Sequence, residues 1–226
     1  RRSTVDFFKT LEIYCLKGDI QKYFYTIDHT ILKKLIRKKI KCKDTLNLLD
    51  EIIDSTKNSI GIPIGNLTSQ LFANIYLNEF DHYIKDVLHV RYYIRYMDDF
   101  IILDDDKKYL NILLKHLQEY LNKELKLKLN SKTQIFLTTK RPIDFLGYVT
   151  FYDHRLLRKN NLKRTIRKFK KFVKQYQNKF ITQDKIDRSV VSWLGHCKWA
   201  DSYHVKNYMI NIFIRKENSL CALYVI

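Results

Sequence analysis

Two adjacent carboxylates, Asp98 and Asp99, interrupt an apolar stretch of the chain. β-branched and aromatic residues flank them at 92–96 and 100–103, a pattern that predicts two strands joined as a hairpin. The pair would lie at the edge of a packed sheet, where unpaired negative charge is costly. A divalent cation would remove that cost. The alternative is a solvated turn, because Asp is a common turn residue.

A third carboxylate, Asp19, ends another predicted strand, at 14–20. Helices are predicted at 30–39 and 45–53, capped by Asp28 and Asp44, because their apolar residues recur at helical spacing. Turn residues fill 58–66. We expect a long helix containing Leu71 that extends to about Lys85, and it precedes the Asp98 hairpin.

The next elements are an amphipathic helix, two strands and a set of helices. Leucines at 110–121 follow a helical period, and Asp104, Asp105 and Asp106 are explained as its capping residues. Strands are predicted at 127–129 and 144–151, with a turn at 152–154 leading into Leu156 and Leu157. From 161 onward the pattern is helical only. We therefore predict an α+β module over 1–160 and a helical module over 161–226.

If the strands that end in Asp19 and Asp98 are neighbours in the sheet, three carboxylates converge. Two divalent ions about 3.5 to 4 Å apart, held by shared carboxylates, would clamp the attacking and leaving oxygens of an in-line phosphoryl displacement. Hard oxygen ligands suit Mg²⁺, with Mn²⁺ as an alternative.

The charge balance points to a polyanionic partner. The 226 residues contain 42 Lys and Arg against 24 Asp and Glu, a net charge of +18, and nucleic acid is the leading candidate. The first helix of the second module has an apolar stripe, and cations fill the rest of its surface. We expect six of these to contact a phosphate backbone: Lys163, Arg164, Arg167, Lys168, Lys171 and Lys174.

The four cysteines are interpreted as thiols, because no C-x-x-C pair is present. A zinc site built from His196, Cys197, His204 and Cys221 is disfavoured, since this spacing fits no common zinc finger. Without a signal peptide or an apolar run of membrane length, the sequence predicts a cytoplasmic protein.

Several motifs resemble those of reverse transcriptases. Asp19-Ile20-Gln21-Lys22-Tyr23-Phe24 resembles motif A, Tyr96-Met97-Asp98-Asp99 motif C, 129–133 motif D and 144–148 the primer-grip motif E. At motif B most relatives have Gln-Gly-x-x-x-Ser-Pro, whereas this chain has Ile64-Gly65-Asn66-Leu67-Thr68-Ser69-Gln70. That variant, and residues 192–200, are similar to diversity-generating retroelement reverse transcriptases.

The resemblance implies a right-hand polymerase palm, with an antiparallel sheet and helices on one face, followed by an α-helical thumb. The palm with residual fingers would cover 1–160 and the thumb 161–226. The chain begins with Arg1, so most of the fingers are expected to precede it, and the fragment alone is expected to polymerise poorly.

The resemblance also implies roles for individual residues. Asp19, Asp98 and Asp99 would be catalytic and, with the Ile20 carbonyl, would bind two Mg²⁺ ions. The expected nucleotide-binding residues are Tyr23, Phe24, Ile64, Gly65 and Lys132, with Phe24 as the steric gate against a ribose 2′-hydroxyl. The primer grip would be formed by Phe145, Leu146, Gly147 and Tyr148. Ser69 and Gln70 would contact nucleic acid.

The implied function is template-directed DNA synthesis on RNA, from dNTPs and a DNA or RNA primer, by a bacterial or phage-encoded enzyme. A basic accessory protein is a further implied partner. Three alternatives stay open: another bacterial reverse transcriptase of the retron, group II intron or abortive-infection type, a non-catalytic nucleic-acid-binding fragment, and a metal-dependent nuclease.

Overall fold

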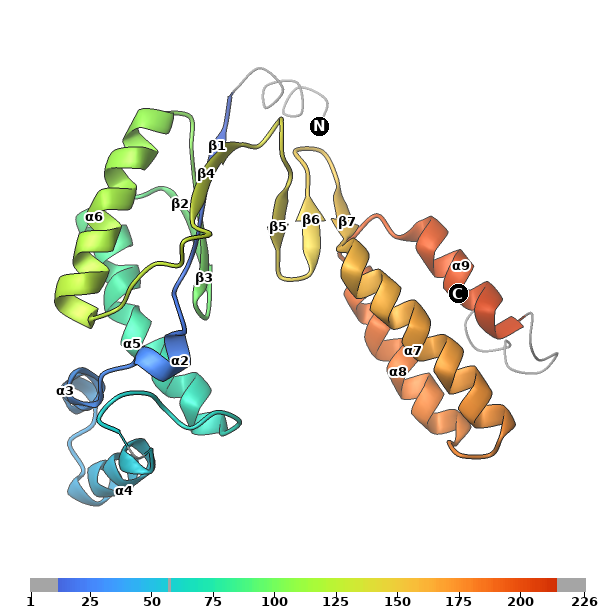
Figure 1. Cartoon of the computed structure of the whole chain (residues 1–226), viewed down its shortest axis with the longest axis horizontal. Coiled ribbons are helices and arrows are strands. Elements are labelled where there is room, and N and C mark those ends of the chain that lie inside the picture. The colour runs from blue at the N-terminus through green and yellow to red at the C-terminus, as the bar shows by residue number, and fades with distance from the viewer. Residues whose placement is uncertain (1–11, 57, 215–226) are drawn as a thin grey trace. The chain divides into compact units, whose positions relative to one another are not determined.

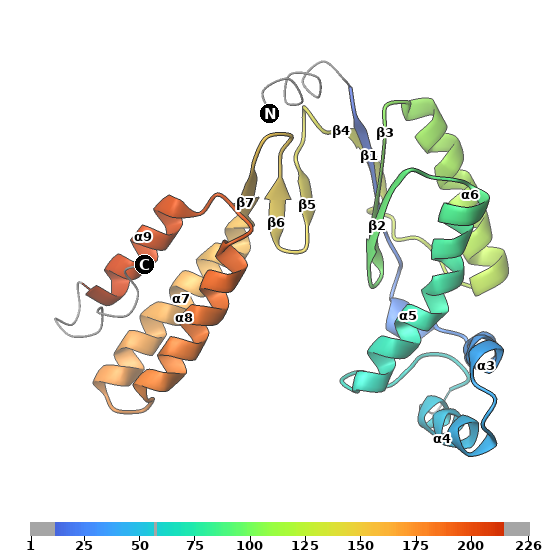
Figure 2. The same ribbon diagram turned by 180° about the vertical axis from the view of Figure 1, so that it is seen from behind.

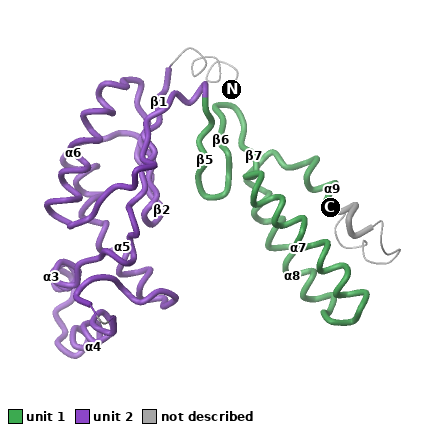
Figure 3. Tube along the Cα trace, in the orientation of Figure 1, with its two compact units in different colours: residues 1–10, 141–226 green, residues 11–140 purple. Residues whose placement is uncertain are grey.

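The computed structural model describes residues 12–56 and 58–214, and side chains as far as residue 209. The described residues form two compact units, 12–140 and 141–214 (Figure 3). The first residues of the predicted palm and the last residues of the predicted thumb, which include Cys221, lie outside the described residues. Among the described helices, none is both long and apolar enough to cross a membrane.

The first unit is built on a four-stranded antiparallel sheet with the order β2-β3-β1-β4. Its strands are β1 (Tyr14–Asp19), β2 (Tyr92–Tyr96), β3 (Asp99–Asp104) and β4 (Gln134–Leu137). Strands β1 and β3 are central neighbours although about 80 residues separate them along the chain. The sheet therefore brings the end of β1 to the β2–β3 turn, which carries Asp98.

The α-helices described in this unit are α2 (Tyr23–Thr26), α3 (His29–Lys39), α4 (Lys43–Asp54), α5 (Leu67–His82) and α6 (Lys107–Leu125). Of these, α5 and α6 cover one face of the sheet (Figures 1 and 2). A π-helical turn, η1 (Tyr83–Val87), continues α5. Figures 1 and 2 both show α5 and α6 on the same side of the sheet. The expected α+β class, an antiparallel sheet with helices on one face, is confirmed.

The core of this unit lies between the sheet and α5 and α6. Alternate strand residues such as Leu16 and Ile102 are fully buried against helix residues such as Leu117, as the two-residue period of a strand requires. Asp28 caps α3, and its side chain accepts from the Ile31 amide at 3.0 Å. Asp106 caps α6 in the same way.

Gly18 allows β1 and β3 to pack closely. It lies opposite Phe100 in the register, and a Cβ added at Gly18 would lie 2.1 Å from the Phe100 ring. That ring is fully buried and packs edge-on against Phe80 at 5.5 Å. A side chain at position 18 would therefore displace an aromatic ring of the core directly beside Asp19.

The second unit contains a small antiparallel sheet and three helices. The strands are β5 (Ile143–Phe145), β6 (Tyr148–Thr150) and β7 (Arg155–Leu157), in the order β5-β6-β7. The helices are α7 (Lys159–Gln177), α8 (Gln183–Cys197) and α9 (Tyr203–Ile214). Phe169, Val173, Ile186 and Val190 form the centre of their shared core.

Three local expectations are corrected. Residues 127–129 form a single bridge, Leu129 with Ile20, and the strand is β4 instead. Residues 144–151 are two strands, because Leu146 and Gly147 have positive φ and form a turn between them. The residue at the N-cap of α4 is Cys42, and Asp44 lies inside its first turn.

The compact units divide after Lys140, whereas the sequence placed its module boundary after residue 160. The three-stranded sheet belongs with α7–α9, since β7 leads directly into α7. The assignment of 1–160 and 161–226 as palm and thumb remains a prediction.

Candidate active site

The sheet brings Asp19 and Asp98 together. Asp19, the last residue of β1, is the register partner of Asp99, the first residue of β3. Asp98 precedes Asp99 in the β2–β3 turn, and its side chain is within hydrogen-bonding reach of Asp19. Residues that are 79 positions apart in the chain thus meet at one sheet edge.

Asp98 is in an environment that disfavours its negative charge. Its pKa is raised above the ordinary value, first by burial and then by the neighbouring charges of Asp19 and Asp99, against the lowering effect of a backbone hydrogen bond. A cation between the carboxylates would cancel the repulsion between their charges and offset the cost of burying Asp98. The arrangement therefore fits a divalent ion at Asp19 and Asp98.

Asp99 does not complete a preformed ligand cluster. Among the described residues, no three His, Cys, Asp or Glu side chains gather into a group that could hold one ion. Asp99 does add to the local negative charge. The structure thus provides a two-carboxylate site, and the expectation that Asp99 is a ligand remains a prediction.

Asn130 orients Asp19, and the sequence analysis assigned it no role. Its side-chain amide donates to Asp19 Oδ2 at 2.8 Å, and its backbone amide donates to the Asp19 carbonyl at 2.7 Å. The Asn130 Oδ1 accepts from the Lys132 amide at 3.1 Å. Because both the nitrogen and the oxygen of the Asn130 side-chain amide are hydrogen-bonded, this side chain fixes the direction of the Asp19 carboxylate.

An ion pair holds the turn that carries Asp98. The guanidinium of Arg95 donates to both oxygens of Asp81 on α5, one at 2.7 Å, and to the carbonyl of Met97 at 2.8 Å. Met97 has φ 54°, in the left-handed region, which is unfavourable for an L-residue. The Arg95 contact therefore stabilises an otherwise strained turn next to Asp98.

The residues after Asp19 place one ring in the core and one at its margin. The Tyr23 side chain is fully buried, and its hydroxyl donates to the Ala73 carbonyl on α5. The Tyr23 ring therefore packs in the core, and a nucleotide contact of Tyr23 stays a prediction. Phe24 is partly buried and packs edge-on against Tyr23 at 5.7 Å.

The Ile20 carbonyl remains a candidate metal ligand. The bridge between Ile20 and Leu129 is made by neighbouring groups, from Gln21 N to Lys128 O and from Asn130 N to Asp19 O. It therefore does not use the carbonyl of Ile20.

The motif B loop exposes Ile64 and Gly65. The Ile64 side chain is 62% exposed, and Gly65 has φ +101° with open space around it. Gln70 is exposed as well. Ser69 is buried, and its hydroxyl donates to the Pro63 carbonyl. The Ser69 hydroxyl therefore helps to close this loop, and the expected contact of Ser69 with nucleic acid stays a prediction.

Lys132 is exposed and lies two residues after Asn130. Only its backbone amide has a described contact with the site, through the Asn130 side chain. The predicted contact of Lys132 with the nucleotide therefore stays a prediction.

The predicted primer-grip residues form the β5–β6 turn in the second unit. Leu146 and Gly147 occupy the turn with φ 51° and φ 86°, which favours glycine at the second position. The Tyr148 hydroxyl lies 2.8 Å from both the Nδ1 and the carbonyl oxygen of His196 on α8. Phe145, at the end of β5, is partly buried.

Helix α7 has opposite faces of different character. Phe169 and Val173 are buried in the core of the second unit. The six predicted nucleic-acid-binding cations are all exposed: Lys163, Arg164, Arg167, Lys168, Lys171 and Lys174. The spacing of these exposed cations, at three and four residues, gives α7 a continuous basic stripe.

Residues 2–150 match the family model described as reverse transcriptase (RNA-dependent DNA polymerase). Protein YkfC of Escherichia coli K12 is 28% identical over 192 residues, covering 66% of this chain and 48% of YkfC. The group II intron-encoded protein LtrA of Lactococcus lactis is 25% identical over 220 residues, covering 66% of this chain and 36% of LtrA. The chain thus spans half or less of the length of these relatives.

The fold is also similar to a solved telomerase. The structure of apo telomerase from Candida tropicalis superposes with a TM-score of 0.58 at 14% identity, covering 95% of this chain and 48% of the telomerase. Since the matched family model covers most of the chain, including Asp19, Asn130 and the Asp98 turn, the chain belongs to the reverse transcriptase (RNA-dependent DNA polymerase) family.

Proposed function

We propose that the protein carrying this chain synthesises DNA on an RNA template by metal-dependent nucleotidyl transfer. The observation that carries the proposal is the meeting of Asp19 and Asp98 at one sheet edge, within hydrogen-bonding reach of each other. Mg²⁺ is commonly bound through one or two carboxylates together with substrate phosphates, and hydrogen-bonded partners orient such carboxylates. Family membership supplies the reaction class.

The residues of the site have separate roles in this proposal. Asp19, Asp98 and the Ile20 carbonyl would hold two Mg²⁺ ions, which supply charge neutralisation for the attacking primer hydroxyl and the departing pyrophosphate. Asn130 keeps the Asp19 carboxylate directed at the site. The Arg95 contact keeps Asp98 in position by holding the Met97 carbonyl.

We further propose that Phe24 selects deoxynucleotides. Its ring is partly exposed at the start of the first helix after Asp19, where an aromatic side chain would collide with a ribose 2′-hydroxyl. The proposed substrates are therefore dNTPs, an RNA template and a DNA or RNA primer. The accessory protein of a retroelement remains a proposed partner.

For the subtype we propose an error-prone enzyme of a diversity-generating retroelement. Ile64 supports this, because it replaces a glutamine with an apolar side chain, and it is 62% exposed. A group II intron-type enzyme is the second candidate, favoured by the similarity to LtrA.

Primer extension on an RNA template by the whole protein that carries this chain tests the reaction, because the chain alone is expected to polymerise poorly. We expect Mg²⁺-dependent incorporation of dNTPs that Asp98→Ala abolishes. The matched control is Asp105→Ala, since Asp105 is an exposed carboxylate before α6 and its removal should leave extension intact. Extension that persists undiminished in a correctly folded Asp98→Ala protein would refute the proposal.

The subtype has its own test, a comparison of copying errors between the wild type and Ile64→Gln. We expect fewer misincorporations opposite template adenines in the variant, with errors opposite the other bases unchanged. Equal error rates at adenine in the two proteins would favour the group II intron-type alternative.

A further inference from the structure

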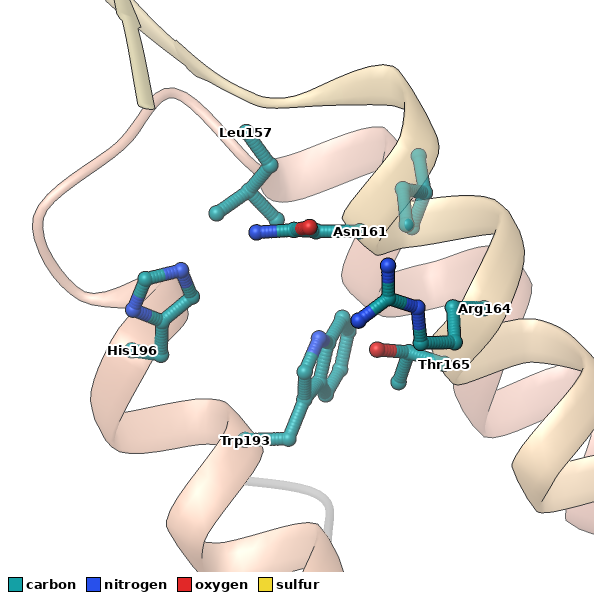
Figure 4. A pocket seen from close by; sticks show the side chains of 7 residues that line it. Leu157, Asn161, Arg164, Thr165, Trp193 and His196 are labelled. Carbon is teal, nitrogen blue, oxygen red and sulfur yellow. The ribbon is translucent and has the colours of Figure 1, made fainter. Parts of the chain in front are cut away.

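A pocket in the second unit lies between the end of β7, the first turns of α7 and the last turns of α8. It has a volume of about 230 Å³, below the roughly 300–1,000 Å³ of pockets for drug-sized ligands, and so suits one small group. Figure 4 shows side chains from both helices directed toward it. The polar ones are Asn161, Arg164, Thr165, Trp193 and His196.

These side chains present hydrogen-bond donors. Among the side chains described, at 12–56 and 58–209, none forms a hydrogen bond or ion pair with the guanidinium of Arg164, the indole N–H of Trp193 or the hydroxyl of Thr165. No acidic residue lines the pocket. Because a guanidinium fork matches the oxygens of a phosphate, this set of donors favours an oxyanion.

The pocket adjoins the primer-grip turn within the same compact unit. A Cβ added at Gly147 would lie 3.0 Å from the Asn161 amide nitrogen and 3.6 Å from His196 Nε2. His196 Nδ1 faces the Tyr148 hydroxyl at 2.8 Å, which leaves Nε2 on the side of the pocket (Figure 4). Two residues of the pocket therefore also support this turn.

We propose that the pocket binds one phosphate group of a nucleic-acid strand and thereby fixes that strand beside the turn at Gly147. The identity of the strand as the primer rests on the proposed function, whereas binding of the phosphate does not. The basic stripe on α7 would attract the strand over its length, and Arg164 would hold a single phosphate at the end of that stripe.

The test follows the indole N–H resonances of the two tryptophans by ¹H–¹⁵N NMR of the whole chain, at constant ionic strength. Inorganic phosphate should shift the Trp193 resonance in a saturable way. Trp199 is an internal control, because it is 65% exposed and does not line the pocket. Arg164→Gln should weaken the response on the order of tenfold, as for the loss of one charge-assisted contact.

Lys170→Gln is the matched variant, since Lys170 lies on the same helix, is exposed, does not line the pocket and is not among the six predicted nucleic-acid-binding cations. It should leave the phosphate response of Trp193 unchanged. Equal effects of the two substitutions, or an unmoved Trp193 resonance, would overturn the proposal.

A second titration distinguishes free phosphate from a strand. A short primer oligonucleotide should move the Trp193 resonance in the same direction and compete with inorganic phosphate. Binding of the oligonucleotide without any change at Trp193 would show that the pocket takes the free ion alone, and would refute the strand assignment. A Trp193 response in the chain, together with failed primer extension by the whole protein that carries it, would refute the polymerase function and leave the phosphate site standing.

Discussion

Asp98 destabilises the metal-free fold and, in the proposed function, binds the metal ions. Burial and two neighbouring carboxylates raise its pKa, so its ionised form opposes folding when no cation is bound. Proteins accept such costs at functional sites, where the shifted group serves the chemistry. The site residues around it can each be tested by a single substitution.

Removing the charge of Asp98 should stabilise the metal-free protein. Because its folded pKa lies above its unfolded pKa, ionised Asp98 destabilises the fold above the folded pKa. This cost disappears as the pH falls below the ordinary Asp value of about 3.9. Asp98→Asn should therefore raise the free energy of unfolding in urea at pH 7, and this gain should shrink with acidification.

The comparison for that experiment is Asp105→Asn, which should show no such pH-dependent gain. A metal-free Asp98→Asn protein that is less stable than the wild type at pH 7 would contradict the described electrostatics.

Asn130 should act on metal binding without contacting substrate. Asn130→Ala removes the amide that orients Asp19, and loss of such an orienting partner typically costs 10–100-fold in metal affinity or activity. We expect a higher Mg²⁺ requirement in primer extension, partly rescued by raised Mg²⁺. Asn122→Ala, an exposed position on α6, is the control, and an identical Mg²⁺ dependence in both variants would count against this role.

The sequence predicted Asp19 and Asp98 but assigned Asn130 no role. Two carboxylates at strand ends have a chemical signature that their residue type and flanking residues reveal. The contact of Asn130 with Asp19 depends on how the segment after α6 pairs with the end of β1. That pairing is a single bridge between two residues, and no periodic pattern in the sequence predicts it.

The contact between α5 and β2 fixes the geometry of the hairpin that carries Asp98. The Arg95 side chain is 9% exposed and pairs with Asp81, which also accepts from the Tyr93 hydroxyl at 2.6 Å. Removing one partner of a buried pair leaves an uncompensated charge. Arg95→Ala should therefore destabilise the fold by about 3–5 kcal/mol, measured by urea unfolding.

A double-mutant cycle separates the ion pair from the loss of side-chain volume. The double variant Arg95→Ala with Asp81→Ala should be less destabilised than the sum of the two single variants. Additive effects would show that the pair does not couple α5 to the hairpin.

Helices were predicted better than short strands. The leucine period at 110–121 lies within α6, because a long amphipathic repeat is a strong signal. Strand β4 has only four residues, all of them partly buried, so it lacks the alternation that marks a strand. The sequence did not predict the β5–β6 turn, because one of its two residues is Leu146, and leucine disfavours the positive φ that the turn requires.

The net charge of +18 should appear as a salt dependence of nucleic-acid binding. Each phosphate contact contributes about −0.9 to the slope of log K against log salt concentration for a DNA duplex. Neutralising the exposed pair Lys171 and Lys174 on α7 with glutamine should therefore reduce the slope by about two, whatever the sequence bound. Fluorescence anisotropy with a duplex at several salt concentrations measures it.

A variant of equal charge tests whether that effect is local to α7. Lys34 and Lys39 are exposed on α3, and their joint replacement by glutamine should leave the slope nearly unchanged. Equal slopes for the two double variants would show that only the total charge matters.

The most direct test of the account is whether Asp19 and Asp98 bind divalent metal together. Titration with Mn²⁺, followed by electron paramagnetic resonance, should show saturable binding to the wild-type chain that Mg²⁺ competes away. That binding should be lost in both Asp19→Asn and Asp98→Asn and retained in Asp105→Asn. Mn²⁺ binding that survives in a correctly folded Asp98→Asn protein would contradict the assignment of this sheet edge as the catalytic metal site.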